Sequence, residues 1–242
     1  MKHEILGNRN CFIAGATGGI GRCIAMRMAE NRCNLFLTAT NIAKLKDLKG
    51  DIESIYGKKN KIYYEHGDLN KIEDINKIII TAREKINTVD ILVNCAGIFV
   101  VKLLANSNLE DFDKTFNLNI RAPFIFCKEF SRDMTRGRWG RVINIGSSSA
   151  YAGSKETSLY CASKHALLGF SRALHDELKE YNIRTYCISP SGVKTKMGKL
   201  IKNQNFHTFL DPREIAEYVV FISSFNGEMV SDEIRLNRMV VE

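Results

Sequence analysis

The sequence predicts a fold of the α/β class, in which helices cover both faces of one parallel sheet. Short apolar segments alternate along the chain with longer amphipathic segments, which is the pattern of repeated strand–helix–strand units. The apolar segments are hydrophobic along their whole length rather than at every second residue, as expected of strands buried on both faces. The chain has 242 residues, of which 45% are hydrophobic and 26% charged. This composition suits a single globular domain over residues 1–242.

The apolar segments are the predicted strands and the amphipathic segments the predicted helices; six strands can be located, in a sheet expected to have about seven. Strands are expected at 11–15, 34–39, 61–67, 89–97, 140–147 and 184–190. Helices are expected at 19–31, 41–57, 70–86, 108–136, 158–181 and 211–224. The last helix has the clearest beginning, because Asp211 can cap its N-terminus and Pro212 suits its first helical position. The segment 196–210 before it is expected to be a short lid over a substrate.

The first predicted strand runs into a glycine-rich loop that opens the first helix. Glycines permit a tight turn there and let backbone N–H groups approach a pyrophosphate at the helix N-terminus. This order of strand, loop and helix predicts a dinucleotide site in a doubly wound sheet of the Rossmann type. The glycine spacing is G-x-x-x-G-x-G rather than the usual G-x-G-x-x-G. The candidate cofactor contacts in this loop are Gly15, Thr17, Gly18, Gly19, Ile20 and Gly21.

The end of the second strand predicts NADP(H) rather than NAD(H) as the cofactor. NAD sites commonly place Asp or Glu there, whereas residues 38–41 are Thr-Ala-Thr-Asn and contain no carboxylate that would repel a 2′-phosphate. Lys44 or Arg22 can add positive charge, although Gly18 and Thr40 stand where an arginine usually binds that phosphate. The polar side chains that can form hydrogen bonds with the phosphate are Thr38, Thr40 and Asn41.

Further motifs follow the glycine loop in chain order. They are Asn94-Cys95-Ala96-Gly97, Asn119-Ile120-Arg121-Ala122-Pro123-Phe124, Ser147, Tyr160-Cys161-Ala162-Ser163-Lys164 and Pro190-Ser191-Gly192-Val193-Lys194-Thr195. With the glycine spacing, they resemble the motifs of the short-chain dehydrogenase/reductase family, from residue 10 to about residue 224. Cys95 stands where the family has a second Asn, and Ser191 stands where it has Gly.

The resemblance implies hydride transfer between a nicotinamide dinucleotide and a carbonyl compound, with four catalytic residues. It implies that Tyr160 protonates the carbonyl oxygen, that Ser147 holds this oxygen, and that Lys164 holds the nicotinamide ribose. Asn119 would anchor a water molecule that relays protons to Lys164. Asp68 would bind the adenine amino group, or cap the following helix, or do both. The cofactor contacts implied in this part of the chain are Asp68, Leu69, Asn94, Ala96, Gly97, Tyr160, Lys164, Pro190, Val193 and Thr195.

Tyr160 and Lys164 lie four residues apart, so in a helix they share one face. Proton transfer near neutral pH works best if the pKa of the phenol, ordinarily near 10, falls by about 3, which takes about 4 kcal/mol of selective phenolate stabilisation. A neighbouring ammonium group and an oxidised nicotinamide would both lower that pKa. The alternative is an ordinary amphipathic helix whose lysine extends its amine to solvent.

The substrate is less well defined than the reaction. The Thr-Ala-Thr segment, Ile145-Gly146-Ser147 and the basic segment 136–141 resemble β-ketoacyl-carrier-protein reductases, and an acidic carrier protein would suit the net charge of +8. Residues 232–238, however, lack the Asp-Gly-Gly ending of those reductases. The apolar lid suits an acyl chain, a steroid-like compound or a small ketone, or it simply packs on the core.

Several classes of partner and site are not expected. The basic residues are spread along the chain, which argues against nucleic acid, and the apolar runs fall far short of the ~20 residues of a membrane span. The N-terminus has no apolar signal core, so a cytoplasmic location is expected. The seven cysteines have no C-x-x-C spacing, so neither zinc nor disulfides are indicated.

Two further expectations concern activity and assembly. A catalytically silent dinucleotide-binding regulator or scaffold is the alternative function, and loss of Tyr160 or Lys164 would be its sign, but both are present. The resemblance also implies a homodimer or homotetramer formed through the helices at 108–136 and 158–181. Apolar side chains in surplus of what one sheet face needs support this, namely Phe124, Phe126, Phe130, Leu167, Phe170 and Leu174.

Overall fold

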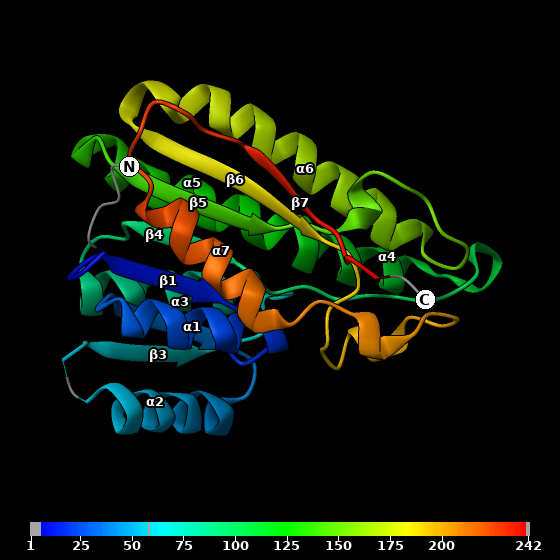
Figure 1. The fold of residues 1–242 in the computed structure, drawn as a ribbon, viewed down its shortest axis with the longest axis horizontal. Helices are drawn as coiled ribbons and strands as arrows, with labels where there is room; N and C mark the ends of the chain where they lie inside the picture. Colours follow the sequence, from blue (N-terminus) through cyan, green and yellow to red (C-terminus); the bar gives the residue numbers. More distant parts are fainter. Residues whose placement is uncertain (1–5, 58, 241–242) are drawn as a thin grey trace.

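A computed structural model describes residues 6–57 and 59–240 of the chain. Residues 1–5, which belong to the N-terminal segment without a signal core, lie outside the described residues, as do residues 58 and 241–242. Seven strands form one parallel sheet in the order β3-β2-β1-β4-β5-β6-β7 (Figure 1). They are β1 (Asn10–Ala14), β2 (Asn34–Ala39), β3 (Ile62–His66), β4 (Ile91–Asn94), β5 (Gly140–Ile145), β6 (Ile183–Pro190) and β7 (Glu233–Leu236). The predicted parallel α/β fold is confirmed.

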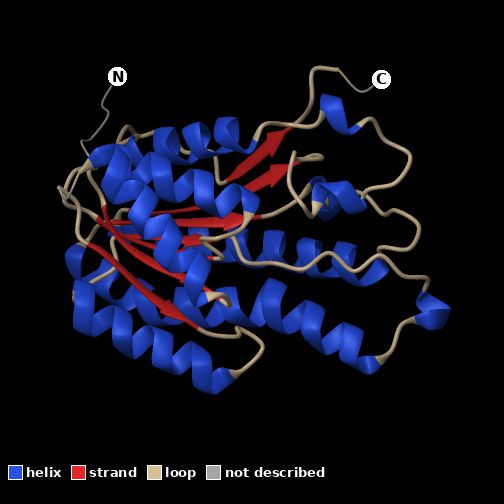
Figure 2. Ribbon diagram, turned by 90° about the horizontal axis from the view of Figure 1, so that it is seen from below, coloured by secondary structure: helices blue, strands red, loops and turns tan. Residues whose placement is uncertain are grey.

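Helices lie on both faces of the sheet (Figure 2). One face carries α1 (Gly19–Glu30), α2 (Ile42–Tyr56) and α7 (Pro212–Ser224). The opposite face carries α3 (Ile72–Ile86), α5 (Ala122–Gly137) and α6 (Ser158–Leu178). Each face has its own hydrophobic core, and successive strand residues alternate between the two cores: Cys11 and Ile13 face one, and Phe12 and Ala14 face the other. The strands are hydrophobic throughout because both of their faces are buried.

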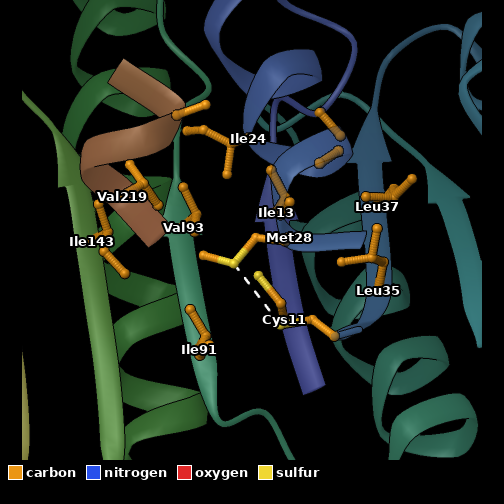
Figure 3. Close-up of a cluster of buried hydrophobic side chains, with 14 of the residues drawn as sticks. Cys11, Ile13, Ile24, Met28, Leu35, Leu37, Ile91, Val93, Ile143 and Val219 are labelled. Carbon is orange, nitrogen blue, oxygen red and sulfur yellow. Dashed lines mark hydrogen bonds between the residues drawn. The ribbon is translucent and has the colours of Figure 1, made fainter. Parts of the chain in front are cut away.

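The core beneath α1 and α7 shows how the first strand–helix unit is held. Ile24 and Met28 of α1 and Val219 of α7 pack against Ile13 and Val93 of the central strands (Figure 3). Each of these side chains is fully buried, and full burial of one such side chain contributes about 1.5–3 kcal/mol. This packing fixes the N-terminal end of α1, and with it the glycine loop, against the sheet. Asp211 caps α7 and Pro212 opens it, as predicted.

The helix predicted at 108–136 is helical but divided into three segments. α4 (Leu109–Phe116) passes through a wider turn of π-helix at Asn117–Arg121 into α5. In this turn the Ala122 N–H donates to the Asn117 carbonyl, five residues earlier. Pro123 explains the change, because it has no N–H for the carbonyl of residue 119 and its ring crowds that carbonyl in a regular helix. The wide turn carries Asn119.

Some predicted boundaries were wrong in ways that affect the site. The apolar segments at 89–97 and 140–147 extend past their strands, which end at Asn94 and Ile145, so Cys95, Ala96, Gly97 and Ser147 lie in the loops that follow. α6 ends at Leu178 and continues as a short 3₁₀ turn, Lys179–Tyr181. β7 was not located by the apolar pattern, because it has only four residues and two of them are charged.

The strand order creates an opening at the carboxyl ends of the strands. β1 and β4 are neighbours in the sheet, but the chain leaves them toward opposite edges, and ligands bind where the order reverses in this way. The lid continues beyond these strand ends, on the right of Figure 1, with two 3₁₀ turns at Gly198–Leu200 and Phe206–Thr208. No helix of the described residues is long and apolar enough to cross a membrane.

Candidate active site

A cavity of about 1060 Å³ lies at the carboxyl ends of the strands. Its walls come from the loops that follow β1 to β6, from the N-terminal part of α6, from the lid and from the C-terminal segment. Most of the predicted site residues line it, although they are far apart in the sequence. Those on its wall are Gly15, Thr17, Gly18, Gly19, Ile20, Thr40, Asp68, Leu69, Ala96, Gly97, Ser147, Tyr160, Lys164, Pro190, Val193 and Thr195.

The glycine loop leaves space that side chains would fill. Gly15 has a φ of +80°, and a Cβ there would lie 2.6 Å from the Ala96 nitrogen. A Cβ at Gly19 would overlap the Thr195 side chain, and a Cβ at Gly21 would overlap the Gly15 carbonyl oxygen. Gly18, the N-cap of α1, offers no side chain to the first N–H groups of the helix. The positive end of α1 therefore borders the cavity without an anion from the loop itself, and a pyrophosphate fits there.

The end of β2 places only part of its predicted phosphate-binding set on the cavity wall. Thr40, Lys44 and Arg22 line the cavity, and Arg22 also pairs with Asp51 at 3.0 Å. The Thr38 side chain is fully buried, and its carbonyl accepts hydrogen bonds from the loop that follows β1. The Asn41 side chain caps α2 by accepting from the Lys44 N–H at 3.0 Å. Neither the Thr38 nor the Asn41 side chain is part of the wall.

Asp68 and Leu69 line the cavity after β3. The Asp68 carboxylate accepts hydrogen bonds from the Asn70 N–H and from the Asn70 side chain, both at 2.9 Å. These bonds, the backbone one first, lower the pKa of Asp68 below its ordinary value. The N-cap of α3 is Lys71, so the alternative in which Asp68 caps this helix was wrong.

Tyr160, Lys164 and Ser147 meet on one wall of the cavity. The Tyr160 ring packs edge-on against Phe99, with the ring centroids 4.7 Å apart. The Lys164 ammonium donates to the Ile145 carbonyl at 2.7 Å and lies 5.8 Å from the centroid of the Tyr160 ring. Ser147 lies two residues after the end of β5, and its hydroxyl accepts a hydrogen bond from the Ser149 N–H at 3.1 Å. Successive turns of α6 thus bring the phenol and the ammonium group to the same site.

The pKa values in this group differ from the sequence-based expectation. Burial raises the pKa of the Tyr160 phenol above its ordinary value, and a hydrogen bond with Ser147 opposes this only in part. Burial also lowers the pKa of Lys164 to about 8. The expected lowering of the phenol pKa is therefore not the net effect: desolvation dominates, and the Lys164 ammonium is directed to the Ile145 carbonyl.

Asn119 and Asn94 are buried behind the cavity wall. The Asn119 side chain accepts from the Ile98 N–H at 2.9 Å and donates to the Ile98 carbonyl at 3.1 Å and to the Ser163 hydroxyl at 2.9 Å. Its contacts hold the loop after β4 against α6, and a role in proton relay stays a prediction. The Asn94 side chain donates to Asn144 at 2.8 Å, which joins β4 to β5.

Some cavity residues had no signal in the sequence. Phe99, Val101 and Leu118 come from the segments after β4, and Arg238 comes from the segment after β7. None belongs to a motif, and only folding brings them to the strand ends. Among the described residues there is no group of three or more His, Cys, Asp or Glu side chains that could hold a metal ion.

Comparisons with known proteins agree with this geometry. A family model described as short chain dehydrogenase matches residues 9–205. The 3-oxoacyl-[acyl-carrier-protein] reductase FabG of Aquifex aeolicus is 29% identical over 92% of this chain and 93% of its own. The human 3-oxoacyl-[acyl-carrier-protein] reductase is 31% identical over 88% and 90%. The crystal structure of a blue fluorescent protein from a metagenomic library, in complex with NADPH, has a TM-score of 0.86 at 28% identity and covers 97% of each chain.

Proposed function

The chain belongs to the short-chain dehydrogenase family of oxidoreductases, and from this we propose that it transfers hydride between NADP(H) and a ketone or secondary alcohol. One observation carries the proposal: Tyr160, Ser147 and Lys164 line the same cavity as the glycine loop at the N-terminus of α1. A carbonyl group held by Tyr160 and Ser147 would therefore lie in the same cavity as a dinucleotide held by the glycine loop. When bound, the nicotinamide ring supplies the hydride for reduction, or accepts it in the reverse direction.

The residues of the chain would supply the proton to the carbonyl oxygen and stabilise the negative charge that develops on it. During reduction Tyr160 gives its phenolic proton to the carbonyl oxygen while the carbonyl carbon gains the hydride, so the products are the alcohol and the oxidised dinucleotide. The raised pKa of Tyr160 keeps the phenol protonated at neutral pH, as an acid must be. Ser147 would donate a second hydrogen bond to the same oxygen and stabilise the negative charge that develops there. The Lys164 ammonium would stabilise the phenolate that remains.

The proposed preference for NADP(H) depends on the end of β2. No carboxylate follows this strand directly, and Arg22, Thr40 and Lys44 line the cavity nearby. Two basic side chains and a hydroxyl favour a ribose that carries a 2′-phosphate. The NADPH-bound structural relative supports the same cofactor.

The proposed substrate class is a 3-oxoacyl thioester, with an acyl carrier protein as a partner. The names of the relatives from Aquifex aeolicus and human support it. Phe99, Met197 and Leu200 give the cavity an apolar wall that suits an acyl chain. The alternative, a silent dinucleotide-binding regulator, would bind NADPH in the same way without turnover of any carbonyl compound.

The substitution Tyr160→Phe, which removes only the phenolic oxygen, tests the proposed function. The wild-type chain and Tyr160→Phe are compared for NADPH and NADH oxidation with 3-oxoacyl thioesters, sugars and simple ketones, and for NADPH affinity by calorimetry. Turnover with NADPH is expected in the wild type. In Tyr160→Phe the turnover rate is expected to fall about 10²- to 10⁴-fold, because general acid catalysis is lost, while the NADPH affinity stays within a few-fold of that of the wild type. Wild-type turnover in Tyr160→Phe would refute the role of this residue. NADPH binding without turnover on the whole panel would favour the silent regulator.

A further inference from the structure

Positive charge gathers in the cavity beyond what the proposed hydride transfer uses. Among the described residues that line it, seven are basic and two are acidic. Four of the basic residues come from the loop before α6, from the lid and from the segment after β7. They are Lys155, Lys196, Lys202 and Arg238. These segments contact one another: Lys202 lies 4.0 Å from Glu156, and Arg238 bonds to the lid. The positive charge therefore lies on the lid side of the cavity.

Arg238 is held in place by neutral groups. Its guanidinium donates to the Gln204 side-chain oxygen at 2.8 Å and to the Thr208 hydroxyl at 3.2 Å, and it lies 5.0 Å from the centroid of the Phe209 ring. In the described part of the chain, no carboxylate lies within 4.0 Å of it. A guanidinium carries five N–H donors, so these two bonds leave further donors and a positive charge on a residue of the cavity wall.

A nearby arginine shows the contrast. Arg235, three residues earlier, lies 3.8 Å from the Glu233 carboxylate and 3.3 Å from the centroid of the Tyr151 ring, and it is not part of the cavity wall. The positive charge of Arg235 is therefore balanced within the protein. Within residues 6–57 and 59–240, the charge of Arg238 has no such balance, and its planar fork of donors has the geometry that binds a carboxylate or a phosphate.

We propose that Arg238, with Lys196 and Lys202 of the same cavity wall, binds an anionic group of the carbonyl substrate. The proposal rests on the proposed function for the carbonyl itself and specifies the rest of the substrate. Met197, Leu200 and Ile201 of the lid, with Phe99 and Val101, line the same cavity. The substrate class is therefore a carbonyl compound with an apolar body and a carboxylate or phosphate at its far end. Two sources fit this chemistry: an oxo acid, or a thioester whose carrier arm contains a phosphate.

Two matched pairs of substrates distinguish these sources. The first pair is 3-oxobutanoate and its neutral ethyl ester. The second pair is 3-oxobutanoyl-coenzyme A and the thioester of the same acyl group with N-acetylcysteamine, which has no phosphate. For each pair the measured quantity is the ratio of kcat/KM for the anionic member to that for the neutral member. The pair with the larger ratio in the wild type identifies the natural anion.

Arg238→Gln is expected to lower this ratio by about 10- to 100-fold, as for the loss of one hydrogen bond to a charged group, mainly through a higher KM. Arg235→Gln is the matched control, because it removes the same charge three residues earlier, in β7 and outside the cavity wall, and its ratio is expected to equal that of the wild type. Arg238→Lys keeps the positive charge but not the planar set of donors, and its ratio is expected to lie between those of the wild type and Arg238→Gln. An unchanged ratio in Arg238→Gln, or an equal loss in Arg235→Gln, overturns the proposal.

A binding measurement separates this proposal from the proposed function. In the Tyr160→Phe background, calorimetry with 3-oxobutanoate and 3-oxobutanoyl-coenzyme A measures affinity without turnover. Adding Arg238→Gln is expected to weaken the binding of the natural anion at least tenfold, and added salt should weaken it in the single variant. If no carbonyl compound is turned over but Arg238 still controls anion binding, only the proposed function fails. Equal anion affinity with and without Arg238 defeats the anion site alone.

Discussion

Burial shifts the pKa values of two residues of the site, Tyr160 and Lys164, in opposite directions. Burial raises the pKa of Tyr160 and lowers the pKa of Lys164 to about 8, because each charged form loses its water. The phenol is therefore the protonated member over the whole neutral range. The ammonium group is the member that loses its charge first as the pH rises, although an exposed lysine has a pKa near 10.4.

The rate of reduction is expected to fall above pH 8. Lys164 is charged below about 8 and neutral above it, and a neutral amine cannot stabilise the Tyr160 phenolate. Since the pKa of Tyr160 is raised above 10, the phenol itself keeps its proton through this range. A profile of kcat/KM for NADPH from pH 6 to pH 10 reports the free enzyme.

The control for this profile is Lys199→Gln, which removes a lid lysine outside the cavity wall. It should keep the decline near pH 8, whereas Lys164→Met should have low activity with no such decline. A wild-type profile that is flat to pH 10 would contradict the assignment to Lys164.

At the scale of elements, the beginning of α1 depends on close backbone contact. Gly21 lies inside this helix and is buried against the Gly15 carbonyl, which a Cβ would overlap. The loop and the helix are therefore fixed relative to each other by an approach that only glycine permits. Gly169, in contrast, is exposed in the middle of α6, and a Cβ there would meet nothing within 4 Å.

The same substitution at these two glycines is expected to have opposite effects. Gly21→Ala should lower the free energy of unfolding by about 1–3 kcal/mol, as overpacking does, and weaken NADPH binding by displacing the loop. Gly169→Ala should raise the free energy of unfolding by about 0.5–1 kcal/mol, because alanine has a higher helix propensity than glycine. Urea unfolding and NADPH titration measure both. A Gly21→Ala variant with wild-type stability and affinity would show that the loop has room to move.

At the scale of the whole molecule, folding decides which apolar groups are available for assembly. Of the six side chains taken from the sequence as a surplus, Phe126, Phe130, Leu167 and Leu174 are buried, and the chain's own cores account for them. Phe124 is 47% exposed, and it packs edge-on against Phe170 at 6.2 Å. The argument for assembly through these helices therefore depends on far less surface than the sequence indicated.

Assembly remains a prediction that sedimentation can test. A dimer or tetramer is expected for the wild type, and Phe124→Lys should shift the mass toward the monomer, since a charge would be buried in the contact. Ile55→Lys is the control, because Ile55 is 62% exposed on α2, a helix of the other face. The expectation is wrong if the wild type sediments as a monomer, and this location is wrong if both variants behave alike.

Only the folded structure shows where the basic residues behind the positive net charge come together. The basic residues are spread along the sequence, and their number alone indicated an acidic partner without a location. Folding brings Lys44, Lys155, Lys196 and Arg238 to one cavity, although they come from four distant segments. This gathering is the basis for the proposed anion site.

The sequence by itself determined the class of fold, the order of the elements and most of the candidate site. This is possible because local rules govern those features: strands buried on both faces must be apolar throughout, a glycine turn must follow the first strand, and Tyr160 and Lys164 are one helical turn apart. The irregular turn at Asn119 was not predicted, because the apolar pattern suggested one unbroken helix over 108–136.

Only the tertiary structure decided which polar groups face the cavity and how they titrate. Thr38, Asn41 and Asn94 have suitable chemistry, yet their side chains serve the sheet or a helix cap. The pKa of Tyr160 rises because burial outweighs the hydrogen bond with Ser147, and Arg238 reaches the cavity from the far end of the chain. Desolvation and contacts between distant segments depend on the position of every neighbour in space, and no local spacing along the chain encodes that position.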